Sequence, residues 1–172
     1  MEEERLRNDL LKWDRKHTDY LKRIYARHER DSGFINSIIG LFLMENELEH
    51  ATSWLLKHHM DNGHNFGQEE VDRIFQKIGK PTYWETQLHL LQILPNVPKN
   101  PKQMAMIEPY IRELLDADKK FVKAAAYQAY LEIVKLFPEL KNDFSTICQK
   151  ALITESASVK VKIRSVLLAL QS

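Results

Sequence analysis

The chain has 172 residues, which is long enough for one domain or one short array of repeats, and its apolar fraction of 44% is ordinary for a globular protein. With 25 basic and 24 acidic side chains, the composition does not favour a protein that binds a polyanion by bulk charge. The single cysteine, Cys148, excludes an intramolecular disulfide and a zinc site built from several thiolates, and a small core residue is its expected role.

The chain begins Met1-Glu2-Glu3-Glu4-Arg5, without an apolar leader segment. Its longest apolar run, Phe34 to Met44, is too short to span a bilayer. We therefore expect a cytoplasmic protein with no membrane partner.

The first predicted element is one charged helix from Glu2 to about Arg30. Its apolar and aromatic residues recur at helical spacing at Leu6, Leu10, Trp13, Tyr20, Ile24 and His28. The segment lacks the layout of the rest of the chain, so we interpret residues 1–30 as an N-terminal capping helix. A coiled-coil seam is the alternative.

A break at Asp31–Gly33 separates this helix from the next, which starts at Phe34. Turn residues predict a loop over Asp61–Gly67. After this loop, a helical stripe is formed by Val71, Ile74, Phe75 and Ile78.

Two later helix starts carry capping signals. Thr82, followed three residues later by Glu85, predicts a capping box that opens a helix at Trp84. Asn100 and Pro101 have the residue types of an N-cap and a first helical position.

The stretch Ile107 to Ile133 predicts two helices, the first interrupted by Pro109, with an acidic break at Asp116 and Asp118 between them. The second helix opens at Val122, carries small residues on its inner side, and ends before Pro138.

The same layout recurs along the chain. Helix starts equivalent to Val122 fall at Leu48, Trp84 and Val159, with successive steps of 36, 38 and 37 residues. Positions four and seven residues after each start keep one apolar face, at Thr52, Leu55, Leu88, Leu91, Ala126, Ala129, Ile163 and Val166. This recurrence favours a helix over a strand for the alternating segment Val159–Arg164.

The recurring layout resembles the HEAT repeat, an antiparallel helix pair that stacks into α-solenoids. The resemblance covers residues 31–172 as a single domain and implies an all-α, right-handed solenoid of about four helix pairs, with about eight or nine helices in total and no sheet. Trp84, aligned with Val122 and Val159, is expected in the core, whereas the role of Tyr83 stays open.

In HEAT-like proteins the second helix of each pair lines a concave, ligand-binding side. The resemblance therefore implies a non-catalytic scaffold that binds a protein or peptide and needs no cofactor or metal. The residues expected to face that side are Glu49, Ser53, Glu85, His89, Gln92, Lys123, Tyr127, Tyr130, Lys160 and Arg164. An ordinary solvated surface is the plain alternative for this set.

A second hypothesis is a nucleic-acid protein similar to the HEAT-like DNA glycosylases. In that case Lys123, Lys160 and Arg164 contact phosphates, and Trp84 with Glu85 stands near a base. The near-neutral charge and the expected burial of Trp84 count against it.

Metal motifs are incomplete. Glu47 and His50 make one Glu-x-x-His step where a di-iron bundle needs two. The segment Asp61–Glu70 lacks the calcium-loop pattern, because Gly63 and Phe66 occupy its third and sixth positions. The histidines near this loop, His58, His59 and His64, are interpreted as surface residues.

The last predicted helix, Val159 to Gln171, has a second apolar strip formed by Val161 and Leu168. Because large apolar patches are normally covered, this strip predicts a homodimer through the C-terminal helix. A final helix that folds back on itself is the alternative.

Overall fold

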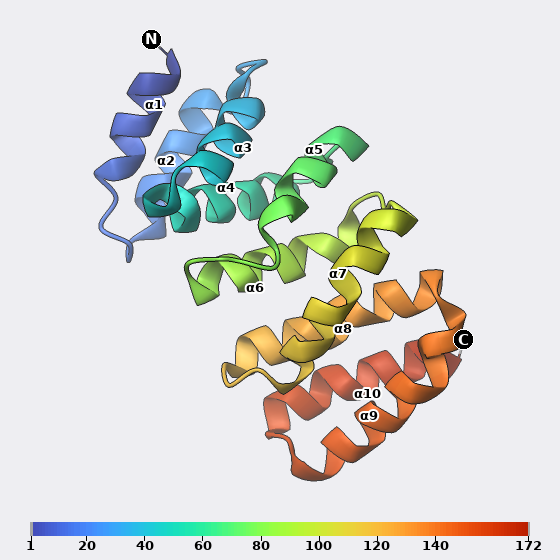
Figure 1. Cartoon of the computed structure of the whole chain (residues 1–172). Coiled ribbons are helices and arrows are strands. Elements are labelled where there is room, and N and C mark those ends of the chain that lie inside the picture. The colour runs from blue at the N-terminus through green and yellow to red at the C-terminus, as the bar shows by residue number, and fades with distance from the viewer. Residues whose placement is uncertain (1, 172) are drawn as a thin grey trace. The chain divides into compact units, whose positions relative to one another are not determined.

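The computed structural model describes residues 2–171, and these form ten α-helices with short 3-10 turns and no strand (Figure 1). The prediction of an all-helical protein is confirmed. The helices are α1 (Glu2–Leu11), α2 (Thr18–His28), α3 (Phe34–Met44), α4 (Glu49–Asp61), α5 (Gln68–Ile74), α6 (Trp84–Ile93), α7 (Pro101–Glu113), α8 (Lys120–Leu136), α9 (Lys141–Thr154) and α10 (Ala157–Gln171). They divide into two compact units, residues 1–93 and 94–172.

The N-terminal segment forms two helices, so the prediction of one helix up to Arg30 was wrong. The chain turns after Trp13, where the Asp14 side chain accepts hydrogen bonds from the backbone N–H groups of Lys16 and His17 at 3.0 and 2.9 Å. Arg15 adopts a left-handed backbone conformation with φ of 62°. An aspartate that binds the backbone two and three residues onward competes with a continuing helix, which explains the turn.

The first unit has its core among α3, α4, α5 and α6. Helix α3 is almost wholly apolar and buries five side chains, at Phe34, Ile38, Ile39, Leu41 and Phe42. The predicted stripe after the Asp61–Gly67 loop is confirmed, since Val71, Ile74, Phe75 and Ile78 are all buried. Helix α4 packs between α3 and α6 and so organises this unit.

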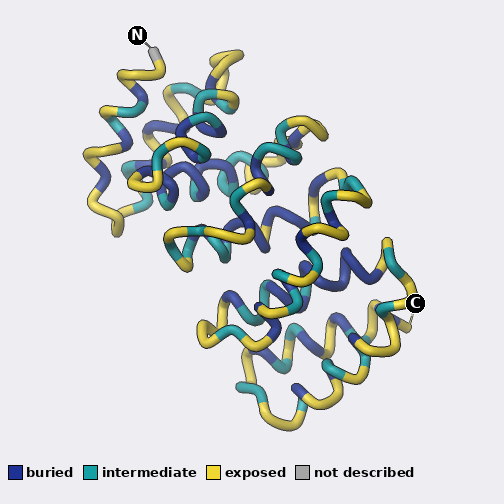
Figure 2. Tube along the Cα trace, in the orientation of Figure 1, coloured by how far each residue is buried: buried dark blue, intermediate teal, exposed yellow. Residues whose placement is uncertain are grey.

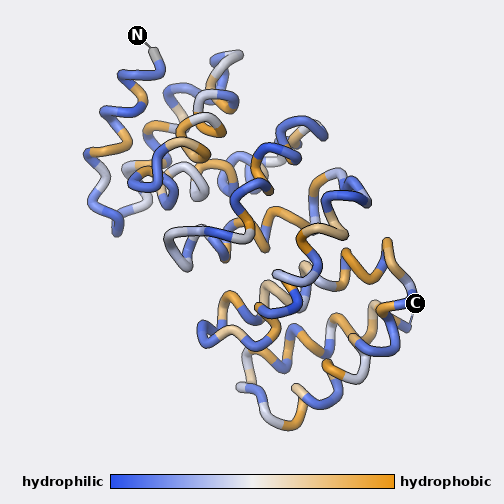
Figure 3. Tube along the Cα trace, in the orientation of Figure 1, coloured by the Kyte–Doolittle hydropathy of each residue, from blue (hydrophilic) through white to orange (hydrophobic). Residues whose placement is uncertain are grey.

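The second unit is built from α7, α8, α9 and α10. Asn100 caps α7 by accepting a hydrogen bond from the Lys102 backbone N–H at 3.0 Å, and Pro101 is the first helical residue, as predicted. Helix α7 continues through Pro109. Helix α8 packs along both α7 and α10, and its buried positions run along most of its length (Figure 2). Apolar and hydrophilic positions alternate along these helices at the spacing of a helical face (Figure 3).

The predicted core positions Leu91, Ala126, Ala129, Ile163 and Val166 are buried, each at 1% exposure or less. Leu88 is only half-buried.

The expected burial of Trp84 was wrong, because its side chain is 38% exposed. Helix α6 turns a different face inward, formed by Thr86, Leu90 and Ile93, which are each 0% exposed. These three residues match the buried positions Val122, Ala126 and Ala129 of α8. The equivalent of Val122 in α6 is therefore Thr86, two residues beyond the predicted one, and its polar side chain hid the register.

Candidate interaction surface

Half of the predicted concave ladder lies inside the protein. Glu49, Ser53 and Tyr130 are 0% exposed, Tyr127 is 1% exposed and His89 is 9% exposed. The prediction of a solvent-facing ladder was therefore wrong for these five residues. The reason is that this side of each helix packs against neighbouring helices within its own unit.

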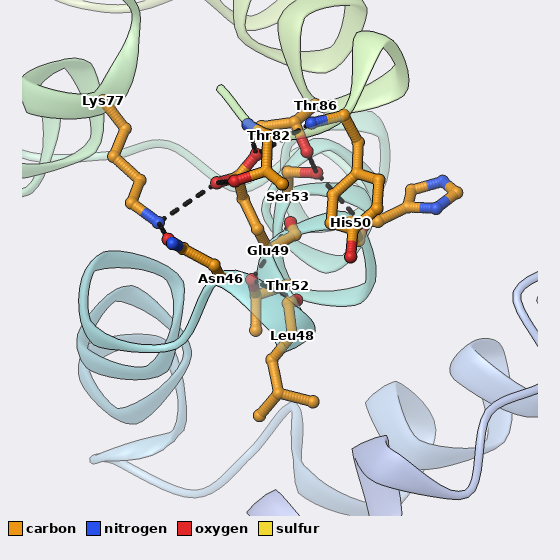
Figure 4. A network of polar contacts seen from close by, with 10 residues as sticks. Asn46, Leu48, Glu49, His50, Thr52, Ser53, Lys77, Thr82 and Thr86 are labelled. Atoms are coloured by element: carbon orange, nitrogen blue, oxygen red, sulfur yellow. Dashed lines mark hydrogen bonds and ion pairs between the residues drawn. The ribbon is translucent and has the colours of Figure 1, made fainter. Parts of the chain in front are cut away.

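Glu49, the first residue of α4, is the centre of a buried polar network (Figure 4). Its carboxylate accepts the backbone N–H of Thr82 at 2.7 Å and the Thr82 hydroxyl at 3.0 Å. It also accepts the backbone N–H of Tyr83 at 3.4 Å and pairs with the ammonium group of Lys77 at 3.1 Å. The network ties the segment before α6 to the start of α4, so its role is structural. Thr82, predicted as a cap, uses its hydroxyl in this network.

A second polar contact joins α4 and α6. The Ser53 hydroxyl lies 3.0 Å from His89 Nδ1 and donates to the Thr86 hydroxyl at 3.3 Å. The His89 ring also stacks with that of His50, with 6.0 Å between ring centroids. Burial first, and then the nearby His50 and Lys57, lower the pKa of His89 to about 3. His89 is thus a neutral packing residue at ordinary pH.

Tyr127 and Tyr130 of α8 pack under α9. Phe144 of α9 lies over both rings, with centroid distances of 6.2 Å to Tyr127 and 4.8 Å to Tyr130. The Tyr130 hydroxyl accepts a hydrogen bond from Arg112 at 2.9 Å and donates to Glu108. Burial raises the pKa of both tyrosines, which keeps them protonated.

The predicted cations of the second unit differ in their exposure and in their hydrogen-bond or ion-pair partners. Lys123 is half-buried and forms an ion pair with Glu155 at 2.7 Å. Lys160 is half-buried and donates to the backbone carbonyl of Ile153 at 3.2 Å. Arg164 is exposed. In the first unit, Glu85 is half-buried and Gln92 is exposed.

The histidines near the Asp61–Gly67 loop pack as aromatic rings. His59 stacks on His64 with 4.4 Å between centroids, and its Nδ1 lies 2.8 Å from the Tyr25 hydroxyl. Burial lowers the pKa of His59 to about 4. Among residues 2–171, no three His, Cys, Asp or Glu side chains gather as a metal site.

Cys148 is fully buried, as predicted for a small core residue, and burial raises the pKa of its thiol to about 12. Its thiolate is therefore not available near neutral pH.

None of the described helices has the length and apolar character needed to cross a membrane. No protein-family model, curated protein or solved structure matches this chain.

The exposed part of α8 is a ridge that the sequence analysis did not single out. Phe121 is 70% exposed, and Ala125 and Gln128, one and two turns further on, are half-buried. These three residues form one helical face, which we call the α8 ridge. In the sequence, the feature that could have indicated this ridge is the pair of small residues Ala124 and Ala125, because small side chains let a partner approach the helix backbone.

Proposed function

We propose that this protein is a module of HEAT-like helical repeats that binds another protein or a peptide and does not catalyse a reaction. Binding uses the exposed side of α8 in the second unit. Of the residues that the sequence predicted on a binding side, Gln92 and Arg164 are exposed, and Glu85, Lys123 and Lys160 are half-buried.

The observation that carries the proposal is the α8 ridge. Phe121 is 70% exposed, and aromatic side chains are enriched in protein interfaces, where they contribute much of the affinity. The alanine beside it offers little steric bulk, so a partner side chain or helix can approach closely.

The nucleic-acid alternative has less support. Two of its three proposed phosphate-binding cations are already engaged, Lys123 with Glu155 and Lys160 with the Ile153 carbonyl. Arg164 alone supplies little of the counterion release on which such binding depends.

The test is site-specific photo-crosslinking in cells. A photoreactive phenylalanine analogue at Gln128 should capture a defined protein partner, and the same analogue at Lys102, an exposed position on α7, should not. Substitution of Phe121 by Ser should reduce capture from Gln128. Equal labelling from both positions, or labelling that Phe121→Ser leaves unchanged, would contradict binding at the ridge.

A further inference from the structure

Helices α8 and α10 bury equivalent positions, which allows their surfaces to be compared residue by residue. With the 37-residue step that relates Val122 to Val159, both helices bury their first, fifth and eighth equivalent positions. In α8 these are Val122, Ala126 and Ala129, and in α10 they are Val159, Ile163 and Val166, all at 0% exposure.

The two helices differ along one stripe. Tyr127 and Leu131 of α8 are 1% and 3% exposed, whereas their equivalents Arg164 and Leu168 are exposed, Leu168 at 69%. Val161, on the same side of α10, is 64% exposed. Val161, Arg164 and Leu168 lie three and four residues apart and therefore form one face, which we call the terminal stripe.

The structure shows what packs against part of the equivalent stripe of α8. Helix α9 places Phe144 against Tyr127, the equivalent of Arg164, with 6.2 Å between ring centroids. The preceding residue, Asp143, forms an ion pair with Arg112 of α7. Within the protein itself, this kind of surface thus packs against a helix that carries an aromatic residue next to a carboxylate.

The charges around the terminal stripe favour an acidic occupant. Lys150, Lys160, Lys162 and Arg164 lie on α9 and α10, and Glu155 is the only acidic residue from 144 to 171. Glu155 is already paired with Lys123. The position equivalent to Arg112 is Gln149, and the exposed Lys150 is its neighbour along α9.

We propose that the terminal stripe binds an amphipathic α-helix of a partner protein, which presents an aromatic side chain flanked by carboxylates. The aromatic ring packs against Leu168 and the Arg164 guanidinium, a contact that combines apolar burial with a cation–π interaction. The carboxylates pair with Lys150 and Arg164. This inference rests on the proposed protein-binding function but uses a surface separate from the α8 ridge.

A second copy of the chain is a poorer occupant than an acidic helix. A two-fold axis midway between Val161 and Leu168 places Arg164 of one copy beside Arg164 of the other. Lys160 and Lys162 of both copies add positive charge to the same contact, and like charges across an interface disfavour association. Charge therefore favours a partner of opposite sign over the homodimer expected from the apolar strip alone.

The experiment measures fluorescence anisotropy with a defined probe. The probe is a labelled peptide with the sequence of residues 138–154 carrying Lys141→Glu, Cys148→Ser and Lys150→Glu, which keeps Asp143 and Phe144 and is acidic. The full chain should bind it saturably, and Leu168→Glu should weaken binding at least about tenfold. Met106→Glu, which also introduces a glutamate in place of an exposed apolar side chain, lies on α7 at a position 81% exposed and should bind as the wild type does.

Reversing the charge at residue 164 tests whether binding depends on the charge of the probe. Arg164→Glu should weaken the acidic probe but gain affinity for a basic probe in which Glu139 and Asp143 are replaced by lysine and the native lysines are kept. Lys102→Glu, an exposed cation on α7, is the matched control. A probe with Phe144→Ala should bind weakly.

The proposal is overturned if the wild type does not bind the acidic probe, or if Leu168→Glu binds it as well as Met106→Glu does. The proposal is also overturned if analytical ultracentrifugation shows a dimer that the Leu168→Glu substitution dissociates, because a second copy then covers the terminal stripe. Crosslinking from Gln128 reports on the α8 ridge independently, so failure of the terminal stripe and failure of the proposed function are distinguishable.

Discussion

Glu49 and Thr82 hold the start of α6 against α4. Both oxygens of a fully buried carboxylate are used, one by the Thr82 backbone N–H at 2.7 Å and the other by its hydroxyl at 3.0 Å. Lys77, with a side chain 15% exposed, balances the negative charge. A charge is tolerated in this core because it is paired and its oxygens accept hydrogen bonds.

Removing the Glu49 carboxylate should therefore destabilise the first unit strongly. We expect Glu49→Ala to lower the free energy of unfolding by about 3–5 kcal/mol, because Lys77 loses its counter-charge and the Thr82 and Tyr83 backbone groups lose their acceptor. Urea unfolding followed by circular dichroism measures this change. Glu47→Ala, a neighbouring exposed glutamate, should change stability by less than about 0.5 kcal/mol. Equal effects for the two variants would rule out the proposed role.

Stability should fall as the pH falls below about 6.5. The folded-state pKa of His89 is lowered to about 3, so the unfolded chain takes up a proton that the folded chain does not. The loss begins near the unfolded pKa of about 6.5 and continues towards pH 3, at roughly 1.4 kcal/mol per pH unit for this group.

Denaturant unfolding at pH 7.0, 6.0 and 5.0 measures that slope. His89→Gln should reduce this slope, and the part that remains comes from groups such as His59, whose pKa is also lowered by burial. His17→Gln should not reduce it, because the pKa of exposed His17 is raised by Asp14 and acts in the opposite direction. An unchanged slope in His89→Gln would show that His89 is not the group responsible.

Enlarging Ala126 should strain the second unit. Ala126 is fully buried on α8, so Ala126→Leu should overpack the layer and lower stability by about 1–3 kcal/mol. Ala105→Leu on α7 adds the same volume at an exposed position and should be close to neutral. Thermal unfolding of both variants tests the assignment, which a neutral Ala126→Leu would refute.

The sequence was sufficient for the helical class, the breaks at Gly33 and Pro138, and the inner faces of α8 and α10, because these depend on local periodicity and turn residues. The turn at Asp14 was missed because the apolar spacing continues past it. The register of α6 was missed because its first buried residue, Thr86, is polar.

The hydrogen-bond and ion-pair partners of buried polar groups could not be predicted from the sequence. Glu49 meets donors 28 to 34 residues away, and nothing local distinguishes it from the exposed Glu47. For the same reason, the predicted ladder mixed buried residues such as Tyr127 with the exposed Arg164.

The first two helices should protect the first unit. Trp13 packs its ring against His50 at 4.9 Å, and Tyr25 packs against Phe34 at 5.9 Å. Deleting residues 1–30 exposes the apolar surfaces under these contacts, so we expect aggregation or a large loss of stability. Light scattering and thermal unfolding measure both. Asn8→Ala, on the exposed side of α1, should have no effect, and a stable, monomeric deletion variant would refute the cap.

Amide hydrogen exchange with and without the acidic probe peptide locates binding on the terminal stripe most directly. We predict that the probe slows amide exchange only in α10 and in the part of α9 next to it. The Leu168→Glu variant should lose this protection, and the Met106→Glu variant should keep it. Protection elsewhere, or none at a probe concentration that saturates anisotropy, would contradict the assignment of this face as a binding surface.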